Sequence, residues 1–315
     1  MVEPIFAAPE PADDRRPLLG YAMVAVAATL FAINGAVSKV ILESGLSTER
    51  LSQVRVTGSL VVLAAGLAAT RPRALRVRTR ELPFLAFFGI CGLAFVQWLY
   101  FLAIDRIAIG IALLMQYLAP LLVALWARFV YREHVRRRIW IALALALAGL
   151  ALILRIWNVG QVDAAGVVFA LGAAITFAVY VLTAERGIRT RDAVSLSCYG
   201  FLFAALFWAA LRPWWSFPAS TATLTVSLHG HLAGIHLPVW ALALWMIVLG
   251  TVAPYGLVVA ALRHVSATRA GIGAMLEPVV AIAVAWLWLA QALGPAQLVG
   301  GTVVLSAIAL AQTAR

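Results

Sequence analysis

The sequence predicts an all-α integral membrane protein with ten transmembrane helices. Of its 315 residues, 64% are hydrophobic and only 12% are charged, and the mean hydropathy is +0.97. A soluble domain carries about 25% charged residues, so this chain has too few polar side chains to cover a globule of its size. Its hydrophobic residues also form long unbroken runs, which favour spanning helices over the alternating strands of a barrel.

Ten such runs follow one another along the chain after a polar N-terminal segment. Crossing a hydrocarbon core of about 30 Å takes about 20 residues of helix, and each run is close to that length. Residues 1–17 hold acidic residues and prolines, so we expect a disordered cytosolic tail there instead of a signal peptide. The expected spans are residues 18–42, 49–70, 82–104, 107–130, 138–157, 163–184, 193–211, 238–262, 267–290 and 294–313.

Arginines cluster in the turns between these spans. When the N-terminus is placed in the cytosol, eighteen arginines fall on the cytosolic side and four, at positions 50, 106, 155 and 212, fall on the outer side. This bias predicts a multi-pass protein of the plasma (inner) membrane with both termini cytosolic. Because the arginines lie in turns, the formal net charge of +11 reports orientation and contact with anionic membrane lipid, so no nucleic-acid partner is expected.

The two halves of the chain resemble each other when Pro120 is aligned with Pro278. The same register, without a gap, places Gly92 over Gly250. In a separate register, Gly20 lies over Gly166, and this places Asn34 over Tyr180. These matches indicate an internal repeat of five spans.

The charges of two equivalent turns indicate how the halves are oriented. The turn at 131–138 is rich in arginine, whereas its counterpart at 289–296 has no basic residue. A repeat of five spans places the second half upside down, so the second turn faces outward and needs no arginine. The sequence therefore predicts two inverted five-helix repeats, which are residues 18–157 and 163–315.

Short motifs inside the spans resemble those of a known transporter family. They are Phe-Ala-Ile-Asn-Gly-Ala-Val-Ser-Lys at 31–39, Arg55, Ala-Pro at 119–120, Pro-Tyr-Gly-Leu at 254–257 and Leu-Glu-Pro-Val at 276–279. With them the chain is similar to the EamA-like members of the drug/metabolite transporter superfamily. The resemblance implies two EamA-type repeats, a central cavity, alternating access and export of metabolites, amino acids or amphiphiles. The chain departs from the family at Gln291, where an acidic residue is common.

Glu277 is the most informative single residue. It lies about ten residues, or roughly 15 Å, into the ninth span and therefore near the membrane midplane. A carboxylate at that depth costs roughly 2.5–3.5 kcal/mol, so it is expected to face protein or water. It is a candidate for proton coupling or for binding a substrate ammonium group. The alternative is a structural carboxyl that bonds backbone groups freed by Pro278.

Other polar residues lie at a similar depth. Gln116, Tyr117 and Pro120 share one face of the fourth span. Pro120 there and Pro278 in the ninth span predict helix breaks. These residues are expected to line a substrate cavity or, in the alternative, to fill a kinked core. Further cavity candidates, which are equally compatible with hydrogen bonds between packed helices, are Asn34, Gln97, Tyr100, Tyr180 and Tyr255.

Two basic residues lie toward the outer ends of their spans. Lys39 and Arg55 are candidates for a basic rim that attracts an anionic group or pairs with Glu43. The alternative is that both long side chains reach the lipid headgroups.

No cofactor or metal is expected from the sequence. Cys91 and Cys198 fall in separate apolar runs, and the spacing of His229, His231 and His236 in the outer loop matches no ligand motif. The fifth and tenth spans hold almost no polar side chain, so they are expected to face lipid or to form a homodimer.

These features predict a secondary transporter for a small-molecule substrate, since no phosphate-binding loop is present to use ATP. An intramembrane enzyme is the first alternative, but an enzyme needs a base near its nucleophile and no histidine lies within a span. A membrane scaffold without transport activity is the second alternative.

Overall fold

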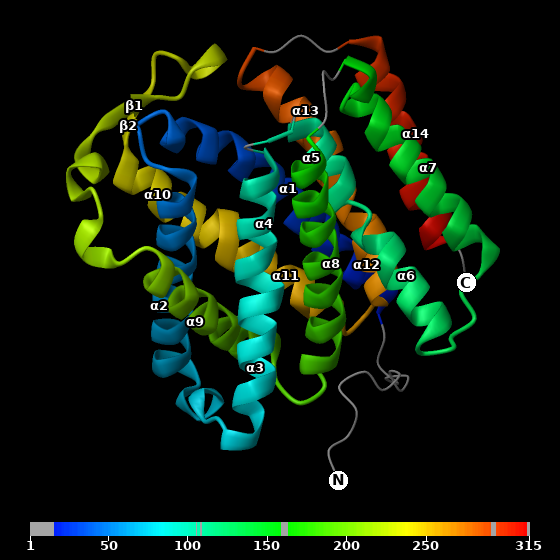
Figure 1. Ribbon diagram of the computed structural model, residues 1–315, viewed down its shortest axis with the longest axis horizontal. Helices are drawn as coiled ribbons and strands as arrows, with labels where there is room; N and C mark the ends of the chain where they lie inside the picture. Colours follow the sequence, from blue (N-terminus) through cyan, green and yellow to red (C-terminus); the bar gives the residue numbers. More distant parts are fainter. Residues whose placement is uncertain (1–15, 105, 108, 159–162, 291–293, 314–315) are drawn as a thin grey trace.

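The computed structural model describes residues 16–104, 106–107, 109–158, 163–290 and 294–313, and most of them are helical (Figure 1). Gln291 lies outside the described residues. The helices of the first half are α1 (Pro17–Leu42), α2 (Thr48–Thr70), α3 (Leu82–Gly89), α4 (Phe95–Ile104), α5 (Ile109–Gln116), α6 (Ala119–Phe129) and α7 (Arg137–Ile153). Those of the second half are α8 (Ala164–Gly187), α9 (Ala193–Leu211), α10 (Val239–Ile247), α11 (Ala253–Ala261), α12 (Ala267–Ala274), α13 (Leu276–Leu287) and α14 (Pro295–Gln312).

Within the described residues, nine helical stretches are long and apolar enough to cross a membrane. They correspond to all the expected spans except 138–157. That segment forms α7, which has 17 residues and ends at Ile153, earlier than the sequence predicted. The helix stops there because Arg155 has a φ of 47°, a left-handed conformation that cannot continue a right-handed helix.

The connection between α9 and α10 departs from the all-α expectation. It contains two short strands, β1 (Thr225–Ser227) and β2 (His236–Pro238), which pair antiparallel. The indole nitrogen of Trp288, at the end of α13, donates to the carbonyl of Leu228 at 2.8 Å, and the His231 amide donates to the carbonyl of Trp288 at 2.8 Å. The hairpin is thereby attached to the end of α13.

The two halves share their irregularities. A π-helix at Ile90–Ala94 joins α3 to α4, and another at Val248–Val252 joins α10 to α11. The two π-helices coincide in the register that aligns Gly92 with Gly250. The breaks between α5 and α6 and between α12 and α13 coincide in the same register. The repeat seen in the sequence is therefore also a repeat of local backbone geometry.

The glycines of the two π-helices pack against the opposite half. A Cβ added to Gly92 would lie 3.1 Å from the Cα of Tyr180, and one added to Gly250 would lie 3.0 Å from the Cβ of Asn34. Tyr180 and Asn34 are equivalent positions of the repeat, so the contact occurs twice. Accordingly α4 packs on α8, and α11 packs on α1. Each half thus places its first helix against the middle helices of the other.

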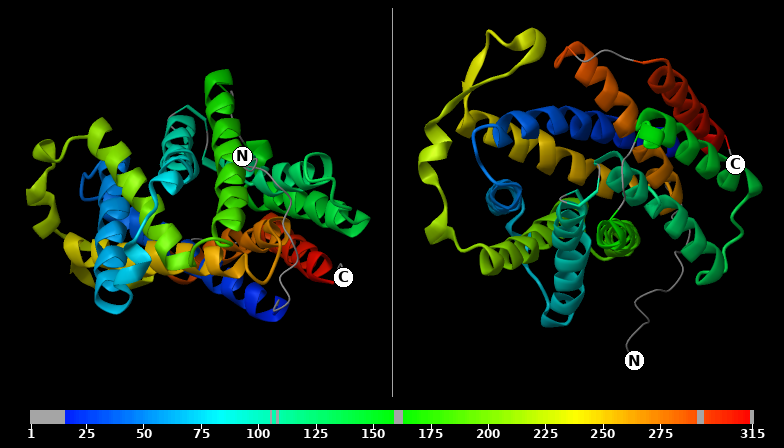
Figure 2. Two further views of the ribbon diagram at one scale, coloured as in Figure 1. Left: turned by 90° about the horizontal axis from the view of Figure 1, so that it is seen from below. Right: turned by 45° about the horizontal axis from the view of Figure 1, so that its top comes forward.

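α7 and α14, the expected fifth and tenth spans, pack against each other along glycines and alanines (Figures 1 and 2). A Cβ added to Gly149 would lie 2.8 Å from the carbonyl oxygen of Gly300, so the two backbones nearly touch. Their other faces are exposed, for example at Ile141 and Leu298. A homodimer through these outer faces stays a prediction.

We expect Gly149→Leu to force α7 and α14 apart and to lower the free energy of unfolding by about 1–3 kcal/mol. Thermal unfolding of the purified protein in detergent measures this. Gly66→Leu is the matched control, because Gly66 is a helical glycine on the exposed face of α2 with open space around it. Equal melting temperatures for the two leucine variants would contradict the close packing.

Candidate functional site

The two helix breaks meet at a hydrogen bond between a tyrosine and a carboxylate. Tyr117 lies in the break between α5 and α6, and its hydroxyl donates to Oε2 of Glu277 at 3.0 Å. Glu277 is the second residue of α13, where the partial positive charge of a helix N-terminus favours a carboxylate. Pro120 and Pro278 lie in the first turns of α6 and α13, positions that tolerate a missing backbone donor. The breaks therefore place Glu277 and Tyr117 together.

Arg55 lies on α2 and binds the second π-helix. Its Nε donates to Oγ1 of Thr251 at 2.8 Å, and its Nη2 lies 3.4 Å from the carbonyl oxygen of Gly250. The Thr251 hydroxyl in turn donates to the carbonyl of Met246 at 2.9 Å. A π-helix shifts backbone hydrogen bonds by one residue and changes which carbonyls are available. Arg55 and Thr251 supply donors at this irregular turn.

An aromatic cluster surrounds Tyr255 on α11. Its ring makes edge contacts with Phe31, Tyr180 and Phe201 at centroid distances of 5.2, 5.7 and 5.5 Å. The guanidinium carbon of Arg55 lies 5.9 Å from the centroid of the same ring, which is within the range of a cation–π contact. The cluster therefore links α1, α8 and α9 to the charged group on α2.

These groups form one site, which we call the central site: Arg55, Tyr100, Tyr117, Tyr255 and Glu277. Arg55 and Tyr100 both lie within electrostatic range of the Glu277 carboxylate. Tyr117 is buried, whereas the other four residues are half-buried, and all five lie within helical stretches that are long enough to span a membrane. Among the described residues no ion pair joins Arg55 to Glu277, since each bonds to neutral partners instead. Both charges thus keep unused hydrogen-bonding capacity.

The remaining cavity candidates are more enclosed than the central site. Asn34, Gln97 and Tyr180 are 4%, 8% and 2% exposed, and their side-chain oxygens have no hydrogen-bond partner among the described residues. Gln116, the last residue of α5, is half-buried. The geometry brings Tyr117 and Glu277 into contact, with Tyr100 near the carboxylate. Tyr255 joins the site through Arg55, and Tyr180 packs against the Tyr255 ring.

The expected basic rim of Lys39 and Arg55 differs from the structure. Lys39 is exposed near the end of α1, but Arg55 turns inward to Thr251 and the Tyr255 ring. Glu43 pairs with His229, in the connection between α9 and α10, and not with either basic residue. Arg55 turns inward because the π-helix and the aromatic ring offer its guanidinium partners within the bundle.

The described residues contain no group of three or more His, Cys, Asp or Glu side chains that is able to hold a metal ion. Thr251 was not recognised from the sequence, since a lone threonine in an apolar span resembles any other small residue. Its only sequence signal is its position beside Gly250, the glycine that the repeat aligns with Gly92.

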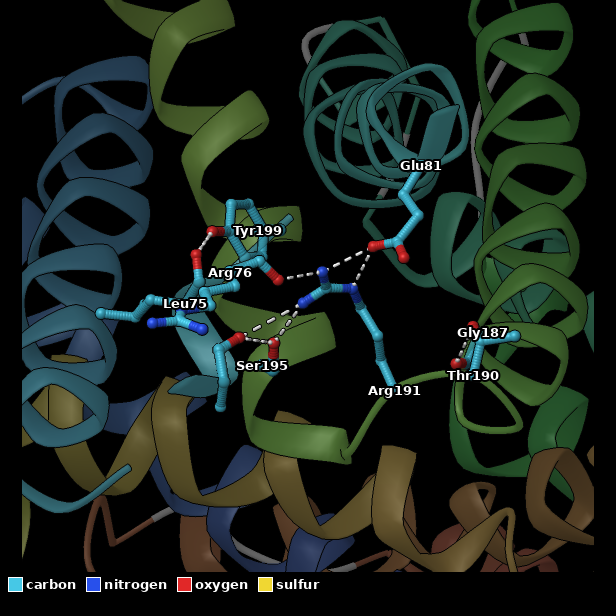
Figure 3. Close-up of polar contacts among 9 residues, drawn as sticks. Leu75, Arg76, Glu81, Gly187, Thr190, Arg191, Ser195 and Tyr199 are labelled. Atoms are coloured by element: carbon cyan, nitrogen blue, oxygen red, sulfur yellow. Dashed lines mark hydrogen bonds and ion pairs between the residues drawn. The ribbon is translucent and has the colours of Figure 1, made fainter. Parts of the chain in front are cut away.

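A network at one end of the bundle centres on Arg191, in the turn between α8 and α9 (Figure 3). Its guanidinium donates to Oε2 of Glu81 from Nε at 2.9 Å and from Nη2 at 2.5 Å, to Ser195 Oγ at 2.7 Å and to the Arg76 carbonyl at 2.7 Å. It also lies 5.1 Å from the Tyr199 ring centroid. Only 10% of the Arg191 side chain is exposed. We call this network the Arg191 clamp.

A second network centres on Arg50, in the first turn of α2. Its guanidinium donates to Gln53 Oε1 at 2.7 Å and to the carbonyls of Pro213 at 3.0 Å and Ser216 at 3.1 Å. The Gln53 amide donates to the carbonyl of Arg212 at 2.6 Å. We call this network the Arg50 clamp.

The two clamps are reciprocal. The first turns of α2 hold the segment that follows α9, and the first turns of α9 hold the segment that follows α2. Gln53 and Tyr199 occupy equivalent positions of the repeat, and Tyr199 donates to the carbonyl of Leu75 at 2.5 Å as Gln53 does to that of Arg212. Since α2 and α9 also pack along each other, the pair is tied at both ends.

The comparison with known families agrees with this repeated architecture. The EamA-like transporter family matches residues 18–155 and again residues 164–313, one match for each half. The chain belongs to the EamA-like transporter family. It is accordingly a multi-pass membrane transporter, and the central site lies where the repeats of this EamA-like protein meet.

Three relatives are similar over most of their length. The threonine/homoserine exporter RhtA of Escherichia coli (strain K12) is 28% identical over 261 residues, which cover 82% of this chain and 79% of the relative. A probable terminal-alkyne amino-acid exporter of Streptantibioticus cattleyicolor is 27% identical, with 85% and 83% covered. The uncharacterized transporter YwfM of Bacillus subtilis is 26% identical, with 78% and 77% covered.

A solved crystal structure has the same fold. It superimposes on this chain with a TM-score of 0.73 at 20% identity and covers 94% of this chain and 95% of its own. At that identity the likeness concerns the fold alone.

Proposed function

We propose that the protein is a secondary exporter of a small amino acid across the inner membrane. The observation that carries the proposal is the central site, where a carboxylate and a guanidinium lie half-buried and unpaired with each other at the meeting point of the two halves. Charges within a span are costly and mark solute or ion pathways. Two relatives are named as amino-acid exporters, which supports this substrate class.

The proposed topology has ten spans, with α7 as the fifth, arranged as two inverted five-helix repeats. Both termini lie in the cytosol, as the arginine-rich turns at one end of the bundle favour. The proposed cycle exchanges inward-open and outward-open states around the central site. The breaks beside Tyr117 and Met275 are the points where α6 and α13 are able to swing, because a helix break interrupts the backbone hydrogen bonds.

We further propose that Glu277 couples export to proton entry. A carboxylate enclosed in protein is able to take up and release a proton as its surroundings open to either side of the membrane. The protein then needs no nucleotide and no cofactor. An enzyme role is less well supported, because all five histidines lie outside the α-helices.

A metabolite screen tests the proposed function. Cells that overproduce the protein are expected to lose one or a few amino acids from the cytoplasm and to gain them in the medium, as measured by mass spectrometry against cells with an empty vector. Unchanged amino-acid levels in both compartments would contradict the proposal. Hydrolysis or group transfer by the purified protein would instead support an intramembrane enzyme.

A further inference from the structure

Within the proposed transport function, we infer that Arg55 and Glu277 bind the two ends of one zwitterionic substrate. In this arrangement the guanidinium holds the α-carboxylate and the Glu277 carboxylate holds the α-ammonium group. The inference rests on the proposed function, but it makes a separate claim about which chemical groups of the substrate the protein recognises and through which residues.

The first argument is the unused bonding capacity of both charges. A guanidinium has five N–H donors, and Arg55 directs one at 2.8 Å to Thr251 and a second, weakly, to Gly250. A carboxylate has about four acceptor positions, and Tyr117 occupies one of those of Glu277. Each charged group is thus held in place by neutral neighbours, and each of the two residues is half-buried.

The second argument is charge balance. A simple anion at Arg55 would also meet the negative charge of Glu277, and a simple cation at Glu277 would meet the positive charge of Arg55. A zwitterion satisfies both groups and adds no net charge to the interior of the membrane. Its carboxylate is able to take two parallel hydrogen bonds from a guanidinium, and its ammonium group offers three donors to a carboxylate.

The third argument is the broken symmetry of the repeat. Groups that the fold needs occur in both halves, as do the π-helices and their glycines. In the same registers Arg55 lies over Phe201, and Glu277 lies over Ala119. Neither charge has a charged counterpart, although both halves fold alike. The equivalent positions thus fold without a charge, and a ligand that binds once per chain accounts for the single occurrence of each charge.

The substrate side chain is expected to contact the aromatic wall of the central site. Tyr255 lies against both Phe31 and Arg55, so a molecule whose carboxylate reaches Arg55 has its next atoms beside this ring. Tyr100 lies within electrostatic range of Glu277. These neighbours favour a compact amino acid with an uncharged side chain, because a further charge would find no partner there.

Ligand binding to the purified protein in detergent tests the inference. The twenty L-amino acids are first compared by their thermal stabilisation of the wild type. The strongest ligand is then compared with its amide, which lacks the carboxylate, and with its N-acetyl derivative, which lacks the ammonium group. We expect the wild type to bind the zwitterion about ten- to a hundredfold more tightly than either derivative.

The two variants are expected to lose different preferences. Arg55→Gln should bind the amino acid and its amide about equally while it still rejects the N-acetyl derivative. Glu277→Gln should bind the amino acid and its N-acetyl derivative about equally while it still rejects the amide. Lys39→Gln, which removes an exposed charge from α1, should change neither ratio. If Arg55→Gln fails to fold, Arg55→Lys is the second variant, because it keeps the charge. It should still bind the amino acid more tightly than its amide, but by a smaller factor than the wild type.

Two outcomes would overturn the inference. One is an unchanged preference for the zwitterion in both Arg55→Gln and Glu277→Gln. The other is a wild type that binds no amino acid but moves a different class of solute, which would leave transport standing and remove the two-charge site. A protein that moves no amino acid in the metabolite screen would instead count against the proposed function itself.

Discussion

Glu277→Gln is expected to reduce transport driven by a pH gradient to the level of liposomes without protein. The glutamine has nearly the same shape, and its carbonyl oxygen is able to accept the 3.0 Å hydrogen bond from Tyr117, so the fold should remain intact. It has no proton to exchange near neutral pH, however. If proton entry passes through this carboxylate, the gradient then has no route by which to drive the substrate.

Proteoliposomes measure this effect with the amino acid identified by ligand binding. Uptake of labelled substrate is followed with an imposed pH gradient, and exchange against unlabelled substrate is followed without one. We expect exchange to persist in Glu277→Gln at a high substrate concentration, which would show that the protein is inserted and able to cycle. Glu277→Asp, which keeps an ionisable group, is the matched variant and should retain part of the driven uptake. Normal driven uptake by Glu277→Gln would remove Glu277 from proton coupling.

Arg191→Gln is expected to lower the stability of the protein by about 2–4 kcal/mol, because it removes charge-assisted hydrogen bonds to Glu81 and Ser195 and leaves the Arg76 carbonyl unbonded. Thermal unfolding in detergent measures the loss. Arg189→Gln is the control, since Arg189 is an exposed arginine of the same turn. Its substitution should leave the melting temperature unchanged.

The same variant reports on the transport cycle. The Arg191 clamp ties the turn between α8 and α9 to the segment between α2 and α3, so its loss should make this end easier to open. Reaction of a single cysteine, placed at the buried Ala193 beside the clamp in a background without Cys91 and Cys198, would reveal the change. A melting temperature and a labelling rate equal to those of the Arg189→Gln control would contradict the importance of the clamp.

The spans and the helix breaks could be predicted because their causes are local. A run of about 20 apolar residues has few alternatives to a spanning helix, and a proline lacks a backbone donor wherever it lies. The depth of Glu277 follows from counting residues along one helix. Its hydrogen bond with Tyr117 does not, because that bond depends on how α5 and α13 are placed relative to each other.

The features that sequence reasoning missed depend on contacts between distant segments. Sequence reasoning placed Arg55 at a rim from its depth alone. The direction of its side chain is instead set by Thr251 on the second π-helix and by Tyr255 on α11. The clamps were visible only as loop arginines, Arg50 among them, with no indication of their partners. The strands β1 and β2 have three residues each, too few for a periodic pattern to reveal.

The extra residue in each π-helix also sets the rotational phase of the helix that follows it. One residue corresponds to about 100° of rotation around a helix axis, so the π-helix at Ile90–Ala94 turns α4 relative to the direction it would have after an unbroken α3. This lets α3 pack on α9 while α4 packs on α8. Deletion of one residue there would restore a plain α-helix, and Gln97 and Tyr100 would point away from their present neighbours without any change in their identity.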